Sequence, residues 1–327
     1  MVKYPNEKGN GIFSIILLSY YSNEKIKKTY ENVCTLFKSE SIDFEFIIID
    51  DGSKDESFEI AQELEKINNN VRAFQLSRNY TSNYAVFAGL SKVQGDCAIY
   101  IPDDEQQPYY TLVEMYRLWQ KGEKLIIPHR VNRDEPFLKK IFSNSFYGIM
   151  NSISDVHYPV GGADLVFMDR EVINIFNSQI HPINTAIVPE ALRLGFSPYF
   201  LPHERPRGTQ EKSRWTFRKK IKLAKDIFFS SSSFPIKLIL HLGLFFSLTA
   251  FCLIVFYLYV KIFGNNVFWG LTVPGWTSII LIISFFSGLI LFSLGVISQY
   301  ILLIYEEVKN RPGYIIKNKN NNSGDDK

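Results

Sequence analysis

Short, uninterrupted apolar runs alternate with stretches of helical periodicity through the N-terminal half of the chain. The runs predict β-strands at residues 13–19, 44–50, 71–76, 97–101 and 125–128. The stretches between them predict helices at residues 23–38, 55–67, 83–92 and 110–121. Because the strands are apolar throughout, we expect an α/β fold with a mostly parallel sheet and helices on both of its faces.

The C-terminal part of the chain carries two much longer apolar stretches. One runs without a formal charge from Leu238 to Val260, and the other from Trp276 to Tyr305. A helix needs about 20 apolar residues to cross the hydrocarbon core of a bilayer, and both stretches are long enough. We therefore expect a hairpin of two transmembrane helices, at residues 237–263 and 276–304.

Basic residues flank both of these stretches. They are Lys219, Lys220, Lys222 and Lys225 before the first stretch, and Lys309, Arg311, Lys317 and Lys319 after the second. Positive charge marks the cytoplasmic side of membrane helices. The pattern predicts a multi-pass protein of the cytoplasmic (inner) membrane, with the large domain and both termini in the cytosol.

The segment just before the first apolar stretch forms a unit of its own. Between residues 214 and 228, arginines and lysines alternate with aromatic and aliphatic side chains. This pattern favours a basic amphipathic helix in the headgroup region. A helix that packs on the core of the soluble domain is the alternative. We divide the chain into a cytosolic domain (1–212), an interfacial helix (213–234), the transmembrane pair (235–305) and a cytosolic tail (306–327).

Composition excludes several classes of protein. The net charge of +3 is too small to indicate nucleic acid as a partner. The three cysteines, Cys34, Cys97 and Cys252, are far apart in the sequence and predict neither a disulfide framework nor a zinc site. Candidate chemistry lies in the polar residues after the predicted strands, because ligands of parallel sheets bind at the carboxyl ends of strands.

The first such group is Asp50-Asp51-Gly52-Ser53, directly after three consecutive isoleucines. The glycine allows a tight turn, so that the second carboxylate can face a ligand beyond the end of the strand. The N–H of a base and the hydroxyls of a ribose are suitable ligands. The alternative is a structural role, with Ser53 or Asp55 as the N-cap of the next helix.

The second group is the pair Asp103 and Asp104, after the predicted strand at 97–101. Adjacent carboxylates suit a hard divalent cation, Mg²⁺ or Mn²⁺, which shares its remaining ligands with substrate phosphates. Such an ion would neutralise the charge that develops on a leaving diphosphate. The alternative is a solvated acidic turn that caps the following helix.

The third group is basic and precedes the interfacial helix. Its members are Arg205, Arg207, Lys212 and Arg214. Guanidinium groups bind phosphate oxygens in a bidentate manner. Contact with anionic lipid headgroups is the alternative, and the two interpretations merge if the substrate is itself a lipid phosphate.

Taken in order, these groups resemble the motifs of family 2 glycosyltransferases of the GT-A fold. More narrowly, they resemble polyprenyl-phosphate glycosyltransferases with two C-terminal membrane helices, the bactoprenol glucosyltransferase-like and dolichol-phosphate mannosyltransferase-like enzymes. The matching segments are residues 46–53, 76–80, 88–90, 95–96, 103–108, 164–170, 213–215, 295–300 and 305–314. The Gln-x-x-Arg-Trp element of processive synthases is absent from the sequence, which favours transfer of a single sugar.

The resemblance implies inverting transfer of one sugar from a nucleotide-diphosphate sugar, of the UDP-sugar type, to polyprenyl phosphate (undecaprenyl or dolichyl) for cell-envelope glycan modification. It implies catalytic roles for Asp104 and Asp164, and a Mg²⁺ or Mn²⁺ ion on Asp103 and Asp104. The implied nucleotide-binding residues are Tyr20, Asp50, Asp51, Ser53, Arg78 and Asp103. The implied ligands of the acceptor phosphate are Arg205, Arg207, Ser213 and Arg214. Membrane lipids are further expected partners, and relatives of this type assemble as homotetramers.

The chain departs from the family pattern at several positions. The first strand ends in Leu18-Ser19-Tyr20-Tyr21-Ser22 instead of Pro-Val-Tyr-Asn-Glu. Pro102 replaces the first aspartate of Asp-x-Asp, and Val166 replaces the arginine of the acceptor block. Two alternatives therefore stay open. One is the same fold with a lipid-linked oligosaccharide or another glycan hydroxyl as acceptor, and the other is a catalytically degenerate membrane scaffold.

Overall fold

The structure, a computed structural model, describes residues 9–103, 108–130, 163, 165–203, scattered positions between 239 and 252, and 275–317. The chain forms two compact units. The first comprises Met1–Ser230 together with Arg311–Lys327, and the second comprises Ser231–Asn310.

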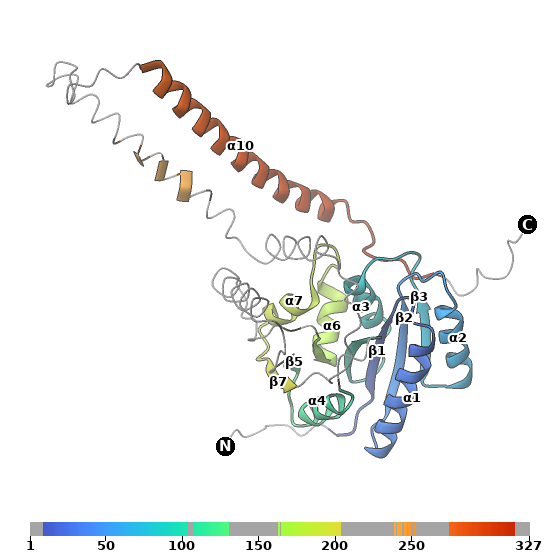
Figure 1. Ribbon diagram of the computed structural model, residues 1–327. Coiled ribbons are helices and arrows are strands. Elements are labelled where there is room, and N and C mark those ends of the chain that lie inside the picture. The colour runs from blue at the N-terminus through green and yellow to red at the C-terminus, as the bar shows by residue number, and fades with distance from the viewer. Residues whose placement is uncertain are drawn as a thin grey trace, which may run out of the picture. The chain divides into compact units, whose positions relative to one another are not determined.

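A sheet forms the centre of the first unit (Figure 1). It has seven strands in the order β3-β2-β1-β4-β6-β5-β7. The strands are β1 (Phe13–Ser19), β2 (Phe44–Asp50), β3 (Val71–Gln75), β4 (Cys97–Pro102), β5 (Leu125–Arg130), β6 (Phe167–Asp169) and β7 (Tyr199–His203). Only β6 pairs antiparallel with its neighbours, β4 and β5, among the named strands. The predicted mostly parallel sheet is confirmed.

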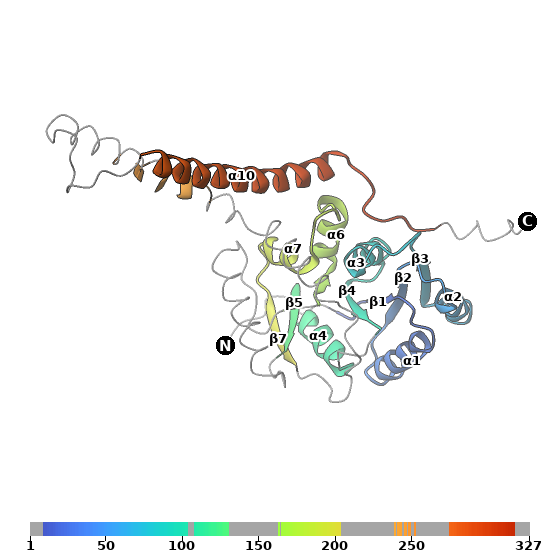
Figure 2. The same cartoon turned by 45° about the horizontal axis from the view of Figure 1, so that its top comes forward.

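Helices cover both faces of this sheet, as Figure 2 shows. They are α1 (Glu24–Ser39), α2 (Ser57–Ile67), α3 (Ser82–Leu90), α4 (Tyr110–Gln120), α6 (Arg170–Gln179) and α7 (Ile187–Arg193). Helices α1, α2 and α4 contribute to one buried apolar cluster, and α3, α6 and α7 to the other. The fold class expected from the sequence is therefore confirmed.

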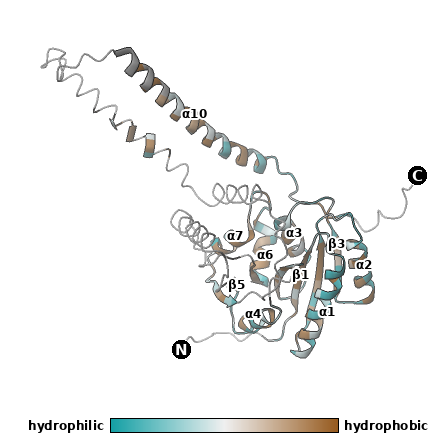
Figure 3. Ribbon diagram, viewed as in Figure 1, coloured by the Kyte–Doolittle hydropathy of each residue, from teal (hydrophilic) through white to brown (hydrophobic). Residues whose placement is uncertain are grey.

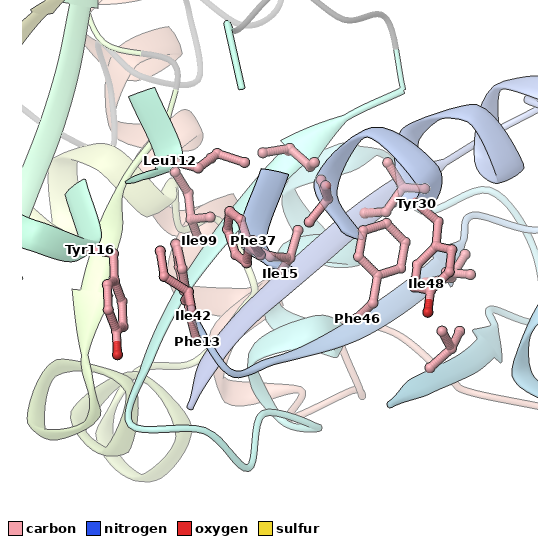
Figure 4. Close-up of a cluster of buried hydrophobic side chains, with 14 of the residues drawn as sticks. Phe13, Ile15, Tyr30, Phe37, Ile42, Phe46, Ile48, Ile99, Leu112 and Tyr116 are labelled. Carbon is pink, nitrogen blue, oxygen red and sulfur yellow. The ribbon is translucent and has the colours of Figure 1, made fainter. Parts of the chain in front are cut away.

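Strand β1 shows why its residues are apolar throughout. Ile15 and Leu17 belong to the cluster beneath α1, whereas Ile16 belongs to the cluster beneath α3. Successive side chains of a strand point to opposite faces, so a strand between two helical layers must be apolar at every position. Figure 4 shows the first cluster, in which Phe13 stacks on Phe37 with ring centroids 5.5 Å apart.

The second unit contains the long helix α10, Gly275–Val308. Its segment Phe285–Val308 is the one helix among the described residues that is long and apolar enough to cross a membrane. Apolar side chains are exposed along it, and hydrophilic residues gather at its C-terminal end (Figure 3). The predicted span at 276–304 lies within this helix. Most of the predicted span at 237–263, and the whole interfacial segment at 213–234, lie outside the described residues.

The residues after α10 return to the first unit. Ile316 forms an antiparallel bridge with Leu76, just beyond the edge strand β3. The backbone N–H of Ser77 donates to the carbonyl of Ile315 at 2.8 Å, and that of Lys317 donates to the carbonyl of Gln75 at 2.8 Å. The sequence predicted only a tail here, but residues 315–317 pair with residues 75–77 through one bridge beside β3.

Candidate active site

The register of three central strands brings predicted nucleotide-binding residues together at the carboxyl ends of these strands. Ser19, the last residue of β1, pairs with Asp50, the last residue of β2. On the other side of β1, Leu18 pairs with Pro102 at the end of β4. The segments that begin at Tyr20, Asp51 and Asp103 therefore leave the sheet side by side. Parallel sheets bind ligands at the carboxyl ends of their strands.

Asp50 is fully buried and shapes the turn after β2. Its carboxylate accepts hydrogen bonds from the backbone N–H of Ser53 at 2.9 Å, from the hydroxyl of Ser53, and from Nε2 of Gln75 at 2.9 Å. These contacts are internal to the protein. Asp50 therefore holds the turn, and Gln75 is a member of this cluster that the sequence did not indicate.

Asp51 joins the turn after β2 to the loop after β3. Its two carboxylate oxygens accept from the backbone N–H groups of Tyr80 at 2.7 Å and Thr81 at 2.9 Å. Burial raises the pKa of Asp51 to about 6, because the two N–H donors offset only part of the desolvation and Asp50 adds repulsion. The carboxylate retains lone pairs for a further donor.

Gly52 is required by the close approach of these two segments. Its φ is +72°, and a Cβ at this position would lie 2.5 Å from the carbonyl carbon of Arg78. Only glycine meets both demands at low cost. Thr81, in the facing loop, has a φ of 83° and a ψ of 160°. This region is strained for a β-branched residue, and such strain concentrates at functional sites.

Arg78 lies beside this turn. Its guanidinium carbon is 4.1 Å from the centroid of the Tyr80 ring, and the Tyr80 hydroxyl is 3.0 Å from the Ser77 hydroxyl. Stacking on the Tyr80 ring holds the planar Arg78 guanidinium near the carboxyl ends of the strands, where a ligand would bind. Such a group suits a diphosphate or a base.

The loop after β1 connects the other two segments. The backbone N–H of Tyr20 donates to the Ser22 hydroxyl at 2.9 Å, and that of Tyr21 donates to the Ser53 hydroxyl at 3.0 Å. The hydroxyl of Ser22 in turn donates to Oδ2 of Asp103. Ser22, where the family pattern has glutamate, therefore orients the predicted metal ligand. The sequence did not single it out for this role.

The capping alternative for the first acidic group is only partly correct. Ser53 bonds Asp50 and Tyr21, and α2 begins only at Ser57, where Asp55 accepts from the Ser57 backbone N–H at 3.3 Å. Helix α4 has no side-chain hydrogen bond from its N-cap, Tyr109, but residues 104–107 of the second acidic group lie outside the described residues, so its capping alternative stays open. The interpretation of Ser53 as an N-cap is therefore wrong, whereas Asp55 contacts the first turn of α2.

Several predicted site residues lie outside the described part of the chain. They are Asp104, Asp164, Arg205, Arg207, Ser213 and Arg214. Ala163, which precedes Asp164, bridges His129 at the end of β5. Within the described residues, no group of three or more His, Cys, Asp or Glu side chains is arranged to hold a metal ion. The metal site stays a prediction that depends on Asp104.

Comparison with known proteins gives the family. The family described as Glycosyl transferase family 2 matches residues 14–176. The uncharacterized glycosyltransferase YkcC of Bacillus subtilis (strain 168) is 30% identical over 306 residues, which cover 93% of each chain. The SfII prophage-derived bactoprenol glucosyl transferase of Shigella flexneri is 29% identical over 307 residues, covering 93% of this chain and 97% of that protein. The chain belongs to glycosyl transferase family 2 and is a glycosyltransferase.

Proposed function

We propose that the protein transfers one sugar from a nucleotide-diphosphate sugar, of the UDP-sugar type, to polyprenyl phosphate at the cytoplasmic face of the membrane, with inversion. The observation that carries the proposal is that Tyr20, Asp51 and Asp103 lie next to one another, each directly after the carboxyl end of a strand. The same chain also contains the apolar helix α10. The similarity to a bactoprenol glucosyl transferase over 93% of the chain supports this acceptor.

The donor nucleotide would bind across the turn after β2 and the loop after β3. Asp51 would accept an N–H of the base, since it directly follows the carboxyl end of β2 and its carboxylate is already held by two backbone donors. Tyr20 and Arg78 would lie along the same ligand. Asp50 and Ser53 would act through the turn, because their hydrogen bonds are spent on its shape.

The metal proposal fits the chemistry of the residues at the end of β4. Asp103 and Asp104 would hold Mg²⁺ or Mn²⁺ through carboxylate oxygens, the ligands that hard cations prefer. The bound ion would neutralise the charge of the departing diphosphate. Ser22 holds Oδ2 of Asp103, so the carboxylate is oriented before a ligand arrives.

A phosphate acceptor makes modest demands on the protein. A phosphate monoester is anionic near neutral pH, so its oxygen attacks without strong base catalysis. The main tasks are to position the acceptor and to stabilise the leaving group. Arg205, Arg207, Ser213 and Arg214 would hold the acceptor phosphate, and Asp164 would orient it.

The membrane arrangement is part of the same proposal. Helix α10 would be the second of two transmembrane helices, with an interfacial helix at 213–234 before the first and both termini in the cytosol. Assembly as a homotetramer is proposed from the resemblance. The acceptor is a lipid, and such a hairpin would keep the domain at the surface where that lipid presents its phosphate.

Acceptor competition tests the proposal. Purified full-length protein receives a labelled nucleotide sugar together with polyprenyl phosphate and a lipid-linked oligosaccharide. We expect label in polyprenyl-phosphate sugar, loss of transfer in Asp104→Asn, and a modest rate decrease in Asp164→Asn. Label in the oligosaccharide, with transfer abolished by Asp164→Asn, would instead establish a hydroxyl acceptor that needs a base.

A further inference from the structure

The C-terminal segment 311–317 lies against residues 75–77 at the β3 edge of the sheet, next to the candidate nucleotide loop. Two backbone hydrogen bonds fix it there, from Ser77 to Ile315 and from Lys317 to Gln75, each 2.8 Å long. Ser77 is followed directly by Arg78, the cation of the nucleotide loop. The chain thus leaves the apolar helix α10 at Val308 and pairs, a few residues later, with the segment that carries Arg78.

Side chains continue this connection inwards. The ammonium Nζ of Lys317 donates to Oε1 of Gln75 at 2.8 Å, and Nε2 of Gln75 donates to Oδ2 of Asp50 at 2.9 Å. An ammonium only donates and a carboxylate only accepts, so the Gln75 amide satisfies both neighbours in one orientation. Asp50 then holds Ser53, whose hydroxyl accepts the Tyr21 N–H at 3.0 Å.

Burial gives this relay its importance. Gln75 is 8% exposed and Asp50 is fully buried. A buried carboxylate that loses a hydrogen-bond donor leaves an uncompensated charge, which the surrounding turn must relax to relieve. Without Lys317, Oε1 of Gln75 loses its charged donor, and the amide that donates to Asp50 is no longer held from both ends. The turn that presents Asp51 would then lose one of its supports.

We propose that Lys317 is a positioning residue of the nucleotide site, acting through Gln75 and Asp50. It does not touch the nucleotide. It fixes the shape of the turn after β2, so that donor affinity depends on a residue encoded after the membrane helix. The inference rests on the proposed function only in taking the turn after β2 and the loop after β3 as the nucleotide site.

The test measures nucleotide affinity in the full-length protein. Lys317→Met removes the ammonium and keeps the apolar stem, and we expect the Kd for UDP to rise about fivefold, the usual net effect of losing one hydrogen bond. The KM for the sugar donor should rise by the same factor while kcat at saturating donor stays within twofold. Lys317→Arg, which retains a donor, should restore the affinity.

Two control variants separate this relay from general effects. Lys309→Met removes an equal charge near the end of α10, where Lys309 contacts only its neighbour Tyr305 among the described residues. Tyr314→Phe removes a hydroxyl from the same segment, 3.4 Å from the carbonyl of Phe87 and outside the relay. Both should bind UDP as the wild type does. An equal loss in Lys309→Met would show a bulk charge effect and overturn the proposal.

A double-mutant cycle tests the route. Gln75→Met should raise the Kd as Lys317→Met does, and the double variant should show no further loss, because both changes break one chain of contacts. Additive losses would contradict the relay, and so would wild-type affinity in either single variant. Each variant tests the proposal alone should the other fail to fold. A wild-type protein that binds neither UDP nor GDP would overturn the proposed function as well.

Discussion

Two buried carboxyl groups lie at opposite ends of strand β2 and differ in how their charge is satisfied. Glu45, near the start of the strand, accepts from the Ser14 hydroxyl at 2.6 Å and from the Gly95 backbone N–H at 2.9 Å, and it pairs with Arg72 at 2.5 Å. Asp51, after the end of the strand, accepts from two backbone N–H groups. The first group is bonded to donors and to a cation, whereas no cation is bonded to the second among the described residues, and Arg78 attracts it only through space.

Their pKa values follow from this difference. Burial alone would raise the pKa of Glu45, but its hydrogen bonds and the attraction of Arg72 outweigh burial, so the pKa lies below its usual value. Burial raises the pKa of Asp51 to about 6, since its donors compensate less. A carboxylate satisfied internally stabilises the fold. One left short of donors is prepared to accept a donor from a ligand.

The largest expected effect separates stability from binding. Glu45→Gln leaves the partly buried Arg72 without its anion, and we expect a loss of about 3 kcal/mol in the free energy of unfolding, the lower end of the cost of breaking a buried pair. The affinity for UDP should stay within twofold when measured below the denaturation midpoint. Asp51→Asn should show the opposite pattern. A variant pair in which both changes affect only stability would contradict the assignment of Asp51.

Gly52→Ala sharpens the comparison through the backbone next to Asp51. The new methyl group would meet the carbonyl carbon of Arg78 at 2.5 Å, at a φ of +72°. We expect about 2 kcal/mol of destabilisation, from strain together with the clash, and a marked loss of UDP affinity. Gly195→Ala is the matched control, since Gly195 has a φ of +80° with no atom within 4 Å. Equal effects of the two substitutions would show that the approach of Arg78 is unimportant.

The pH dependence of binding reports on Asp51 directly. The charged form accepts the base N–H, so affinity for UDP should rise as pH increases through about 6 and level off above 7. Stability should change in the opposite sense. The folded-state pKa lies above the usual 3.8, so the protonated group stabilises the fold at low pH and this contribution decreases as pH rises towards about 6. Isothermal titration calorimetry at a series of pH values should show this rise in UDP affinity in the wild type and no such rise in Asp51→Asn.

Ser22→Ala should have the smallest effect, on the metal half of the site. Without the hydroxyl that donates to Asp103, the carboxylate loses its orientation, and we expect about tenfold slower sugar transfer, equivalent to one hydrogen bond with a charged group. Metal-free UDP affinity should not change. Ser39→Ala, which removes an exposed hydroxyl bonded to the Leu36 carbonyl, serves as control. Loss of UDP affinity in Ser22→Ala would place this residue with the nucleotide turn instead.

The sequence predicted the central sheet well because its strands are buried on both faces. The bounds of β1 and β2 coincide with the predicted runs, and α1, α2, α3 and α4 begin and end within two residues of prediction. Strands β6 and β7 gave no such signal. The first has three residues, and the second exposes Tyr199 and Phe200 at the edge of the sheet.

The candidate site was predictable only as far as strand ends determine it. Asp51 and Asp103 were indicated because ligands of parallel sheets bind at the carboxyl ends of strands, and the strand register confirms that both residues lie there. The contacts of Ser22, Gln75 and Lys317 depend on pairing between residues far apart in the sequence, such as Leu76 with Ile316. Local patterns carry no information on these partners.

One measurement tests the central claim most directly. The full-length protein in lipid nanodiscs is given undecaprenyl phosphate and each member of a panel of nucleotide sugars, and the lipids are analysed by mass spectrometry. We predict that one sugar donor yields undecaprenyl phosphate heavier by a single sugar residue, that product forms only with Mg²⁺ or Mn²⁺, and that Asp51→Asn reduces it at limiting donor. Nucleotide binding without a lipid product from any member of the panel would contradict the account.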